Sequence, residues 1–139
     1  MSANTTPIFT LTPNCQVVTI SAANTASDGS GTLVTLFSAG LNGSRLDSIV
    51  FKNAQITPAA SSAMVGRVFL TDSAGANPRL IEEVAIPAAT RTASAVGATS
   101  TITFSNGLVI SSGQIVKVIT SVYAGPQDLF HVIAKGGDY

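Results

Sequence analysis

The chain has 139 residues, the usual size of one domain, with 45% hydrophobic and only 10% charged residues. Seven acidic and seven basic side chains give a net charge of zero, which argues against an electrostatic nucleic-acid-binding protein. Such low charge fits a protein that associates with a partner, because copies repel each other little. No apolar run approaches the roughly 18 residues of a membrane span, so we expect no membrane association.

The first 14 residues predict an extended N-terminal arm, followed by a single domain over residues 15–139. This segment lacks the basic and apolar regions of a secretory signal, so we expect folding in a cytoplasm. Two interpretations of the arm stay open: it is the first edge strand of the domain, or it docks on a partner by strand addition. Its prolines, which cannot donate to a strand ladder, flank Ile8, Phe9 and Leu11.

Strand signals follow in chain order through the rest of the sequence. Stretches rich in β-branched and aromatic residues alternate with clusters of Gly, Asn, Asp, Ser and Pro, without helix caps. This pattern predicts an all-β fold, an antiparallel β-sandwich or jelly roll of about 8 strands. The predicted strands are residues 16–22, 32–39, 45–56, 64–72, 79–87, 99–105, 108–111, 114–124 and 129–135.

Two of these stretches, residues 64–72 and 114–124, carry apolar side chains at both alternating sets of positions. An antiparallel strand of this kind needs cover on both faces. A second sheet supplies one cover. For the other, a loop, the N-terminal arm and a neighbouring subunit all remain open.

The stretch "FSAGLNGSRLDSIVF", residues 37–51, is the most site-like glycine cluster of the chain. It is not a P-loop, because Gly43 is followed by Ser and Arg and then by a strand pattern. Instead, Asn42 and Gly43 predict a type I′ turn between two strands. Arg45 is suited to grip a carboxylate or backbone carbonyls, and Asp47 would lie on the same face of its strand.

The sequence predicts no catalytic residue, no cofactor and no metal site. The single histidine, His131, has no second His or Cys pair to make a zinc site. Glu82 and Glu83 are adjacent, so on a strand they face opposite ways and form no glycosidase pair. The single Cys15 excludes an internal disulfide, and we expect it to be a small buried residue. We therefore expect a binding or structural protein rather than an enzyme.

The segments "NTTPIFTLTPN", "DGSGTLVTLFSAGLNGSRLDSIVFK" and "FHVIAKGGDY" resemble short virion structural proteins of tailed bacteriophages, of the head-decoration (cement) type. The resemblance implies a non-enzymatic protein on the capsid surface of a phage virion, assembled in the cytoplasm of the bacterial host. It also implies the major capsid protein as a partner and a homotrimer standing on local threefold sites. The shared elements lie at residues 7–9, 28–49, 67–72 and 134–139.

An alternative is a phage tail or fibre subunit, or a module that binds a host-surface glycan. A glycan-binding module usually offers exposed aromatic residues, whereas this chain has no Trp and two Tyr. The glycines of the terminal "GGDY" predict flexibility, so Tyr139 either anchors on a neighbour or ends a disordered tail. The residues expected to make intermolecular contacts are Ile8, Phe9, Leu11, Arg45 and Tyr139.

Overall fold

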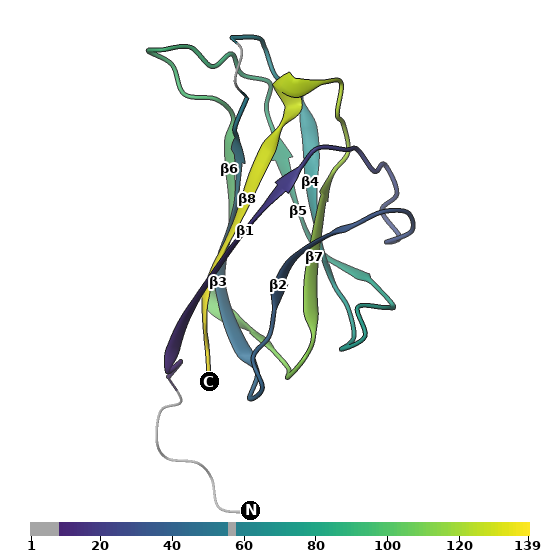
Figure 1. The fold of residues 1–139 in the computed structure, drawn as a ribbon, viewed down its shortest axis with the longest axis vertical. Coiled ribbons are helices and arrows are strands. Elements are labelled where there is room, and N and C mark those ends of the chain that lie inside the picture. Colours follow the sequence, from purple (N-terminus) through teal and green to yellow (C-terminus); the bar gives the residue numbers. More distant parts are fainter. Residues whose placement is uncertain (1–8, 56–57) are drawn as a thin grey trace, which may run out of the picture.

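The computed structural model describes residues 9–55 and 58–139, which form an all-β sandwich with one short 3₁₀ turn (Figure 1). Ile8, one of the predicted contact residues, lies outside the described residues. The elements are β1 (Thr12–Ile20), β2 (Val34–Ser38), β3 (Ser44–Asn53), β4 (Met64–Leu70), β5 (Arg79–Ile86), β6 (Thr99–Ile110), β7 (Ile115–Thr120), η1 (Pro126–Asp128) and β8 (Phe130–Asp138).

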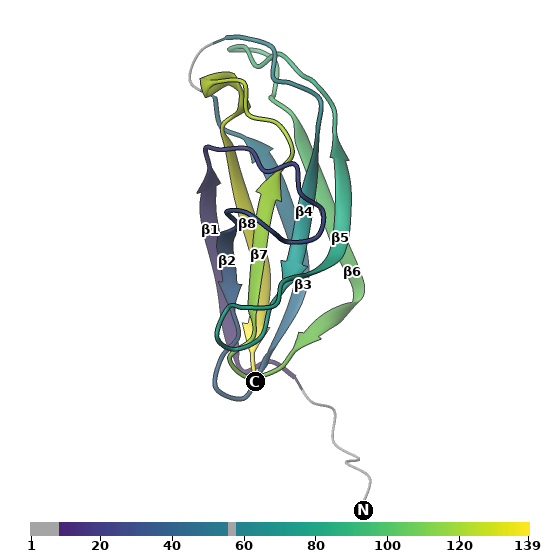
Figure 2. The ribbon, with the colours of Figure 1, turned by 90° about the vertical axis from the view of Figure 1, so that its right-hand side faces the viewer.

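The strands form two four-stranded sheets that pack face to face (Figure 2). The first sheet has the order β1-β8-β3-β6 and the second the order β2-β7-β4-β5. Strands from the two halves of the chain pair antiparallel in reverse order: β1 with β8, β2 with β7, β3 with β6, and β4 with β5. This is the folded-over arrangement of a jelly roll. The predicted fold class is confirmed.

The core lies between the two sheets and is built from the inward set of alternating side chains. Phe37 of the second sheet and Phe51 and Phe130 of the first are fully buried there. Gly66 of β4 makes room for the Phe51 ring, because a Cβ at this position would lie 2.9 Å from it. Each such burial contributes about 1.5–3 kcal/mol, so this layer supplies much of the folding free energy.

The predicted strands at 99–105 and 108–111 are one continuous strand, β6, so the break between them, which we expected from the turn residues "SNG" at 105–107, was wrong. The strand bends instead of reversing. Ser48 pairs with Thr103 and Leu46 pairs with Leu108, so residues 104–107 of β6 oppose a single residue of β3. Gly107, with a φ of 71°, lies in this bulge. From the sequence alone, a glycine at such a position is interpreted as part of a turn.

Strand β1 begins at Thr12, inside the segment that we assigned to the arm. Residues 12–14 pair with β8 at the edge of the first sheet, in line with the edge-strand interpretation of this part. The division into an arm of residues 1–14 and a domain of residues 15–139 remains a prediction.

The outer face of the second sheet is covered by the chain's own loops over its two central strands, β7 and β4. Arg67 and Phe69 lie two residues apart on β4 and share this face, and Ile119 of β7 is the direct partner of Arg67. Phe69 is 0% exposed and Ile119 is 2% exposed. The loop 21–33, between β1 and β2, passes over β7 and β4 (Figure 2). Of the three covers left open for residues 114–124, the structure shows a loop.

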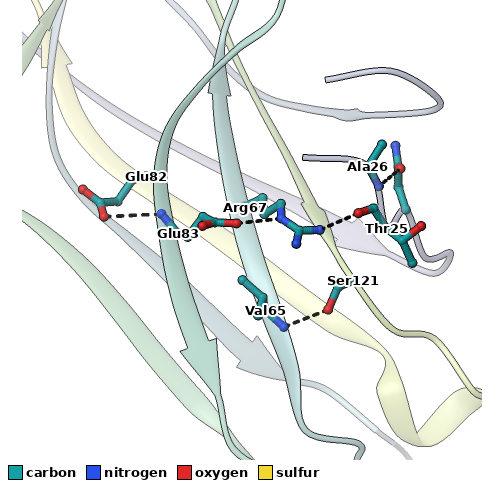
Figure 3. Close-up of polar contacts among 8 residues, drawn as sticks. Thr25, Ala26, Val65, Arg67, Glu82, Glu83 and Ser121 are labelled. Carbon is teal, nitrogen blue, oxygen red and sulfur yellow. Dashed lines mark hydrogen bonds and ion pairs between the residues drawn. The ribbon is translucent and has the colours of Figure 1, made fainter. Parts of the chain in front are cut away.

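Two basic side chains on this face hold two loops in place. Arg67 Nη1 donates to the carbonyl oxygen of Thr25 at 3.1 Å, while its Nε pairs with Glu83 at 2.7 Å (Figure 3). Lys117 Nζ donates to the carbonyl oxygen of Gly75, in the loop between β4 and β5, at 2.8 Å. These cations are therefore engaged within the fold, and they fix the cover over Phe69.

Candidate interaction surface

Segments from both ends of the chain and the turn between β2 and β3 meet at one end of the sandwich (Figure 1). Leu11 N donates to Asp138 O at 2.8 Å, and Tyr139 N donates to Gly43 O at 3.2 Å. These contacts bring together the N-terminal, glycine-turn and C-terminal segments that carried the resemblance. We call this region the terminal end and define it as residues 9–13, 40–45, 107–110 and 136–139.

Asp138 joins the strands of the terminal end. Its carboxylate accepts hydrogen bonds from Asn14 Nδ2 of β1, at 3.0 and 3.2 Å, and from the Ser44 hydroxyl of β3. The Ser44 oxygen in turn accepts from Gly40 N at 2.9 Å. The hydrogen bonds from Asn14 and then Ser44 lower the pKa of Asp138, because they stabilise its charged form. The ionised side chain thus connects β1, β3, β8 and the β2–β3 turn.

The turn that precedes β3 is not the predicted type I′ turn. Gly43 N donates to Gly40 O at 3.0 Å, so the central residues are Leu41 and Asn42. Among the described non-glycine residues only Asn77 has a positive φ, whereas a type I′ turn needs it at both central positions. The geometry is that of a type I turn, with Gly43 following at φ 86°. The reason is that this turn crosses between the sheets and closes no hairpin.

The C-terminal glycines are part of the sheet, so the flexibility expected for residues 136–138 was wrong. Both Gly136 and Gly137 lie in β8 between β1 and β3. A Cβ at Gly136 would lie 2.2 Å from the carbonyl oxygen of Arg45, and one at Gly137 would lie 2.7 Å from the Thr10 side chain. The glycines are needed for close backbone approach rather than for freedom.

Exposed apolar side chains gather at the terminal end. Phe9 is 73% exposed, Leu11 83%, Leu41 93% and Val109 66%. Leu11 directly precedes β1 and continues its pairing with β8, Leu41 is at the tip of the turn, and Val109 is paired with Arg45 across β6 and β3. Single exposed apolar residues are ordinary, but several at one end of a domain are typical of an interaction surface.

Two predicted contact residues of this region are anchored by intramolecular bonds. Arg45 Nε pairs with Asp47 Oδ1 at 2.8 Å, and both side chains are solvent-accessible. The shared strand face was therefore predicted correctly, although the contact is made by one nitrogen rather than by a bidentate grip. The carbonyl oxygen of Tyr139 accepts from Asn42 Nδ2 at 3.4 Å. Their roles toward a partner stay predictions, as do those of Phe9 and Leu11.

Two single residues of the sequence lie on the outer face of the first sheet. Cys15 is exposed on the edge strand β1, so the expectation of a buried thiol was wrong. An edge strand leaves the side chain at such a position uncovered. His131 is exposed on β8 between Thr19 of β1 and Lys52 of β3.

The described part of the chain offers no group of three His, Cys, Asp or Glu side chains that could hold a metal ion. Within the same residues, none of the helices has the length and apolar character needed to cross a membrane.

No protein-family model matches the chain, and no curated protein matches it. Among solved structures, the chain is similar to one from the T13 viral particle of infectious bursal disease virus, at 14% identity and a TM-score of 0.31. It is also similar to one from the Gt strain of that virus, at 19% identity and a TM-score of 0.29. These matches cover 99% and 98% of this chain but 35% of each viral chain. At such TM-scores the likeness carries no functional argument.

Proposed function

We propose that the chain is a non-enzymatic structural protein of a virus particle, which binds the capsid surface of a tailed phage and stabilises it as a homotrimer. The observation that carries this proposal is the set of exposed apolar side chains at the terminal end: Phe9, Leu11, Leu41 and Val109. The resemblance of the sequence to head-decoration proteins rests in part on segments that meet at this same end.

Several weak sites acting together suit this surface better than one strong site. Ordering an extended segment costs about 1–2 kcal/mol per residue in backbone entropy. Burial of an apolar side chain such as Leu11 returns about 1.5–3 kcal/mol. One copy of the terminal end therefore binds weakly. A trimer engages three such sites on one lattice, and the second and third contacts form at high effective concentration.

The proposal is tested with purified protein and capsids assembled without it. A Leu11→Ser, Leu41→Ser double variant should lower occupancy in a co-sedimentation assay at least about tenfold, because two buried leucine contacts exceed 1.4 kcal/mol. Val96→Ser is the matched control, since Val96 is exposed and belongs to the loop 87–98, which lies at the opposite end of the sandwich (Figure 1). Wild-type protein that does not sediment with the capsids would overturn the capsid role itself.

The oligomeric state is a separate measurement. Light scattering after size-exclusion chromatography should give about three times the 14.1 kDa mass of one chain. A monomer that still saturates capsids would overturn the preformed trimer and leave capsid binding intact.

A further inference from the structure

The net charge of zero conceals an uneven distribution of charge. Every charged side chain lies within the described residues. Lys52 and Lys135 project from the outer face of the first sheet, and Arg91 lies in the adjoining loop 87–98. Of the exposed carboxylates only Asp47 is on this side, where it is paired with Arg45. The other exposed acids, Asp28, Glu82 and Glu83, belong to the second sheet and its loops, as does the half-buried Asp72.

A pocket of about 320 Å³ lies where the loop 87–98 overhangs the end of β3. Its lining comprises Lys52, Asn53 and residues 91–97, so it contains two cations, two hydroxyl side chains and one amide, but no acid and no aromatic ring. This volume is at the lower end of the range for small-ligand pockets, about 300–1,000 Å³. The lining therefore favours a small, polar and negatively charged ligand.

The two cations of this pocket are not neutralised by the fold. Neither Lys52 nor Arg91 forms an ion pair with a described residue, in contrast to Arg45 and Arg67. Arg91 Nη1 lies 3.4 Å from the Asn53 carbonyl oxygen and 3.5 Å from that of Gln55, which are long hydrogen bonds. They place the guanidinium over the end of β3 and leave most of its five donors for a ligand.

We propose that this pocket binds the carboxylate of an acidic sugar unit. A guanidinium matches a carboxylate through two parallel hydrogen bonds, and the Lys52 ammonium adds a second positive charge. The Thr92 hydroxyl accepts from Ala95 N at 3.0 Å and lies 3.5 Å from the Ser94 hydroxyl, so both hydroxyls keep part of their hydrogen-bonding capacity for the ring hydroxyls of a sugar. The lining has no aromatic side chain, so a nucleobase would have no stacking partner and a sugar ring no aromatic platform; the carboxylate therefore has to supply the main contact. The overhanging loop also favours a single small unit over the flat surface of an acidic protein.

The position of this pocket makes it independent of the terminal end. Ser44 begins β3 at the terminal end, and Lys52 and Asn53 finish the same strand at the pocket. A ten-residue strand spans about 30 Å, so the two sites lie at opposite ends of the sandwich. The pocket remains open when the terminal end is docked, and its ligand does not depend on the proposed capsid role.

Titration of isotope-labelled protein with sodium glucuronate, followed by the backbone amide signals of Lys52 and residues 91–97, tests the assignment. We expect saturable shifts confined to these signals and none with glucose, which lacks the carboxylate. Arg91→Ala and Lys52→Ala should each weaken binding at least about tenfold, the loss of one charge-assisted hydrogen bond. Arg79→Ala, which removes an exposed cation of β5 far from the pocket, should leave the titration unchanged.

A thermal melt of each variant controls for folding, and Arg91→Lys separates charge from geometry. This variant keeps the positive charge but loses the planar fork, so it should bind glucuronate more weakly than wild type. Equal binding of sodium sulfate would show an unselective anion site and overturn the proposal. Tighter binding of an acidic peptide such as tetraglutamate would assign the carboxylate to a protein partner instead. Glucuronate shifts that persist in Arg91→Ala would also overturn it.

Discussion

The central strands of both sheets carry apolar side chains on their outer faces, but these side chains differ in burial. On the second sheet, Ile119 and Phe69 are buried beneath loops of the same chain. On the first sheet, the equivalent central row runs through Val17, Ile133 and Val50, and Val17 is 56% exposed. The jelly roll places a long crossing loop over only one of its faces. Apolar side chains on the outer face of a strand therefore have two different environments here. On the second sheet they form a second small core, and on the first sheet they form a surface that is open to other molecules.

The cations of the two faces differ in the same way. On the covered face, Arg67 and Lys117 each donate to a loop carbonyl oxygen, and Arg67 also pairs with Glu83. On the open face and its adjoining loop, Lys52 and Arg91 have no described ion-pair partner. Arg91 also contacts carbonyl oxygens, those of Asn53 and Gln55, but at the long distances of 3.4 and 3.5 Å, so its contrast with Arg67 is one of ion pairing.

The largest expected contrast comes from the same substitution on the two faces. Ile119→Ala should lower the free energy of unfolding by about 2–5 kcal/mol, because it removes fully buried methyl groups and leaves a cavity. Ile133→Ala, on the half-exposed central strand β8, should cost only about 1 kcal/mol. Urea denaturation of both variants measures the difference. Equal losses of unfolding free energy would mean that the open face is covered in solution, as by self-association. In that case, dilution of the protein should reduce the loss for Ile133→Ala and not the loss for Ile119→Ala.

A smaller effect is expected from the carboxylate that closes the first sheet at the terminal end. Asp138→Asn should lower the free energy of unfolding by about 1 kcal/mol, since charge-assisted hydrogen bonds from Asn14 and Ser44 are weakened. The folded-state pKa of Asp138 is lowered. Its contribution is thus fully present above the ordinary pKa of about 3.9 and is lost as the pH falls through the lower folded value.

Urea midpoints between pH 6 and pH 2 test this linkage. The difference in urea midpoint between wild type and Asp138→Asn should be constant near neutral pH and should shrink as the pH approaches 2. A difference that grows on acidification would contradict the role assigned to the ionised form.

The third prediction concerns the attachment of the loop over the second sheet. Arg67→Met keeps much of the apolar stem but removes the bonds to Thr25 and Glu83. Because the ion pair is partly exposed, the global loss should be about 1 kcal/mol or less. The local effect is larger: the amide of Asn24, which donates to Thr120 O at 3.0 Å, should exchange with solvent faster than in wild type. Unchanged exchange would show that the loop needs no anchor.

The smallest effect is an acid-induced loosening confined to the covering loops. Hydrogen bonds from Ser30 lower the pKa of Asp28, and those from Ala76 and then Asn77 lower the pKa of Asp72. Both carboxylates therefore favour the closed loops above their ordinary pKa and lose this contribution as the pH falls through the folded values. As the pH falls through these folded values, the protection of amides in residues 21–33 and 71–78 against exchange should decrease before that of the strands. Protection that decreases uniformly along the chain would contradict a loop-specific effect.

The candidate surfaces were only partly visible in the sequence. The Arg45–Asp47 pair was found because strand periodicity places residues two apart on one face, whereas Phe9 and Leu11 were proposed as apolar residues of a proline-flanked segment. Leu41 was missed because a turn residue carries no periodic signal. The pocket was missed because Lys52 and Arg91 come from different elements, β3 and the loop 87–98, and only the fold brings them together. Their lack of carboxylate neighbours was the available signal.

The sequence by itself determined the all-β class and most strand positions, because alternation and turn residues act over a few neighbouring positions. It did not determine that "SNG" bends a strand, that Gly136 and Gly137 are close-approach positions, or which molecule covers Ile119. Those outcomes depend on contacts between residues far apart in the chain, such as Gly136 with Arg45 and Asn24 with Thr120. Only the tertiary structure decided them, because a local pattern records that an apolar face or a glycine is needed but not what lies opposite it.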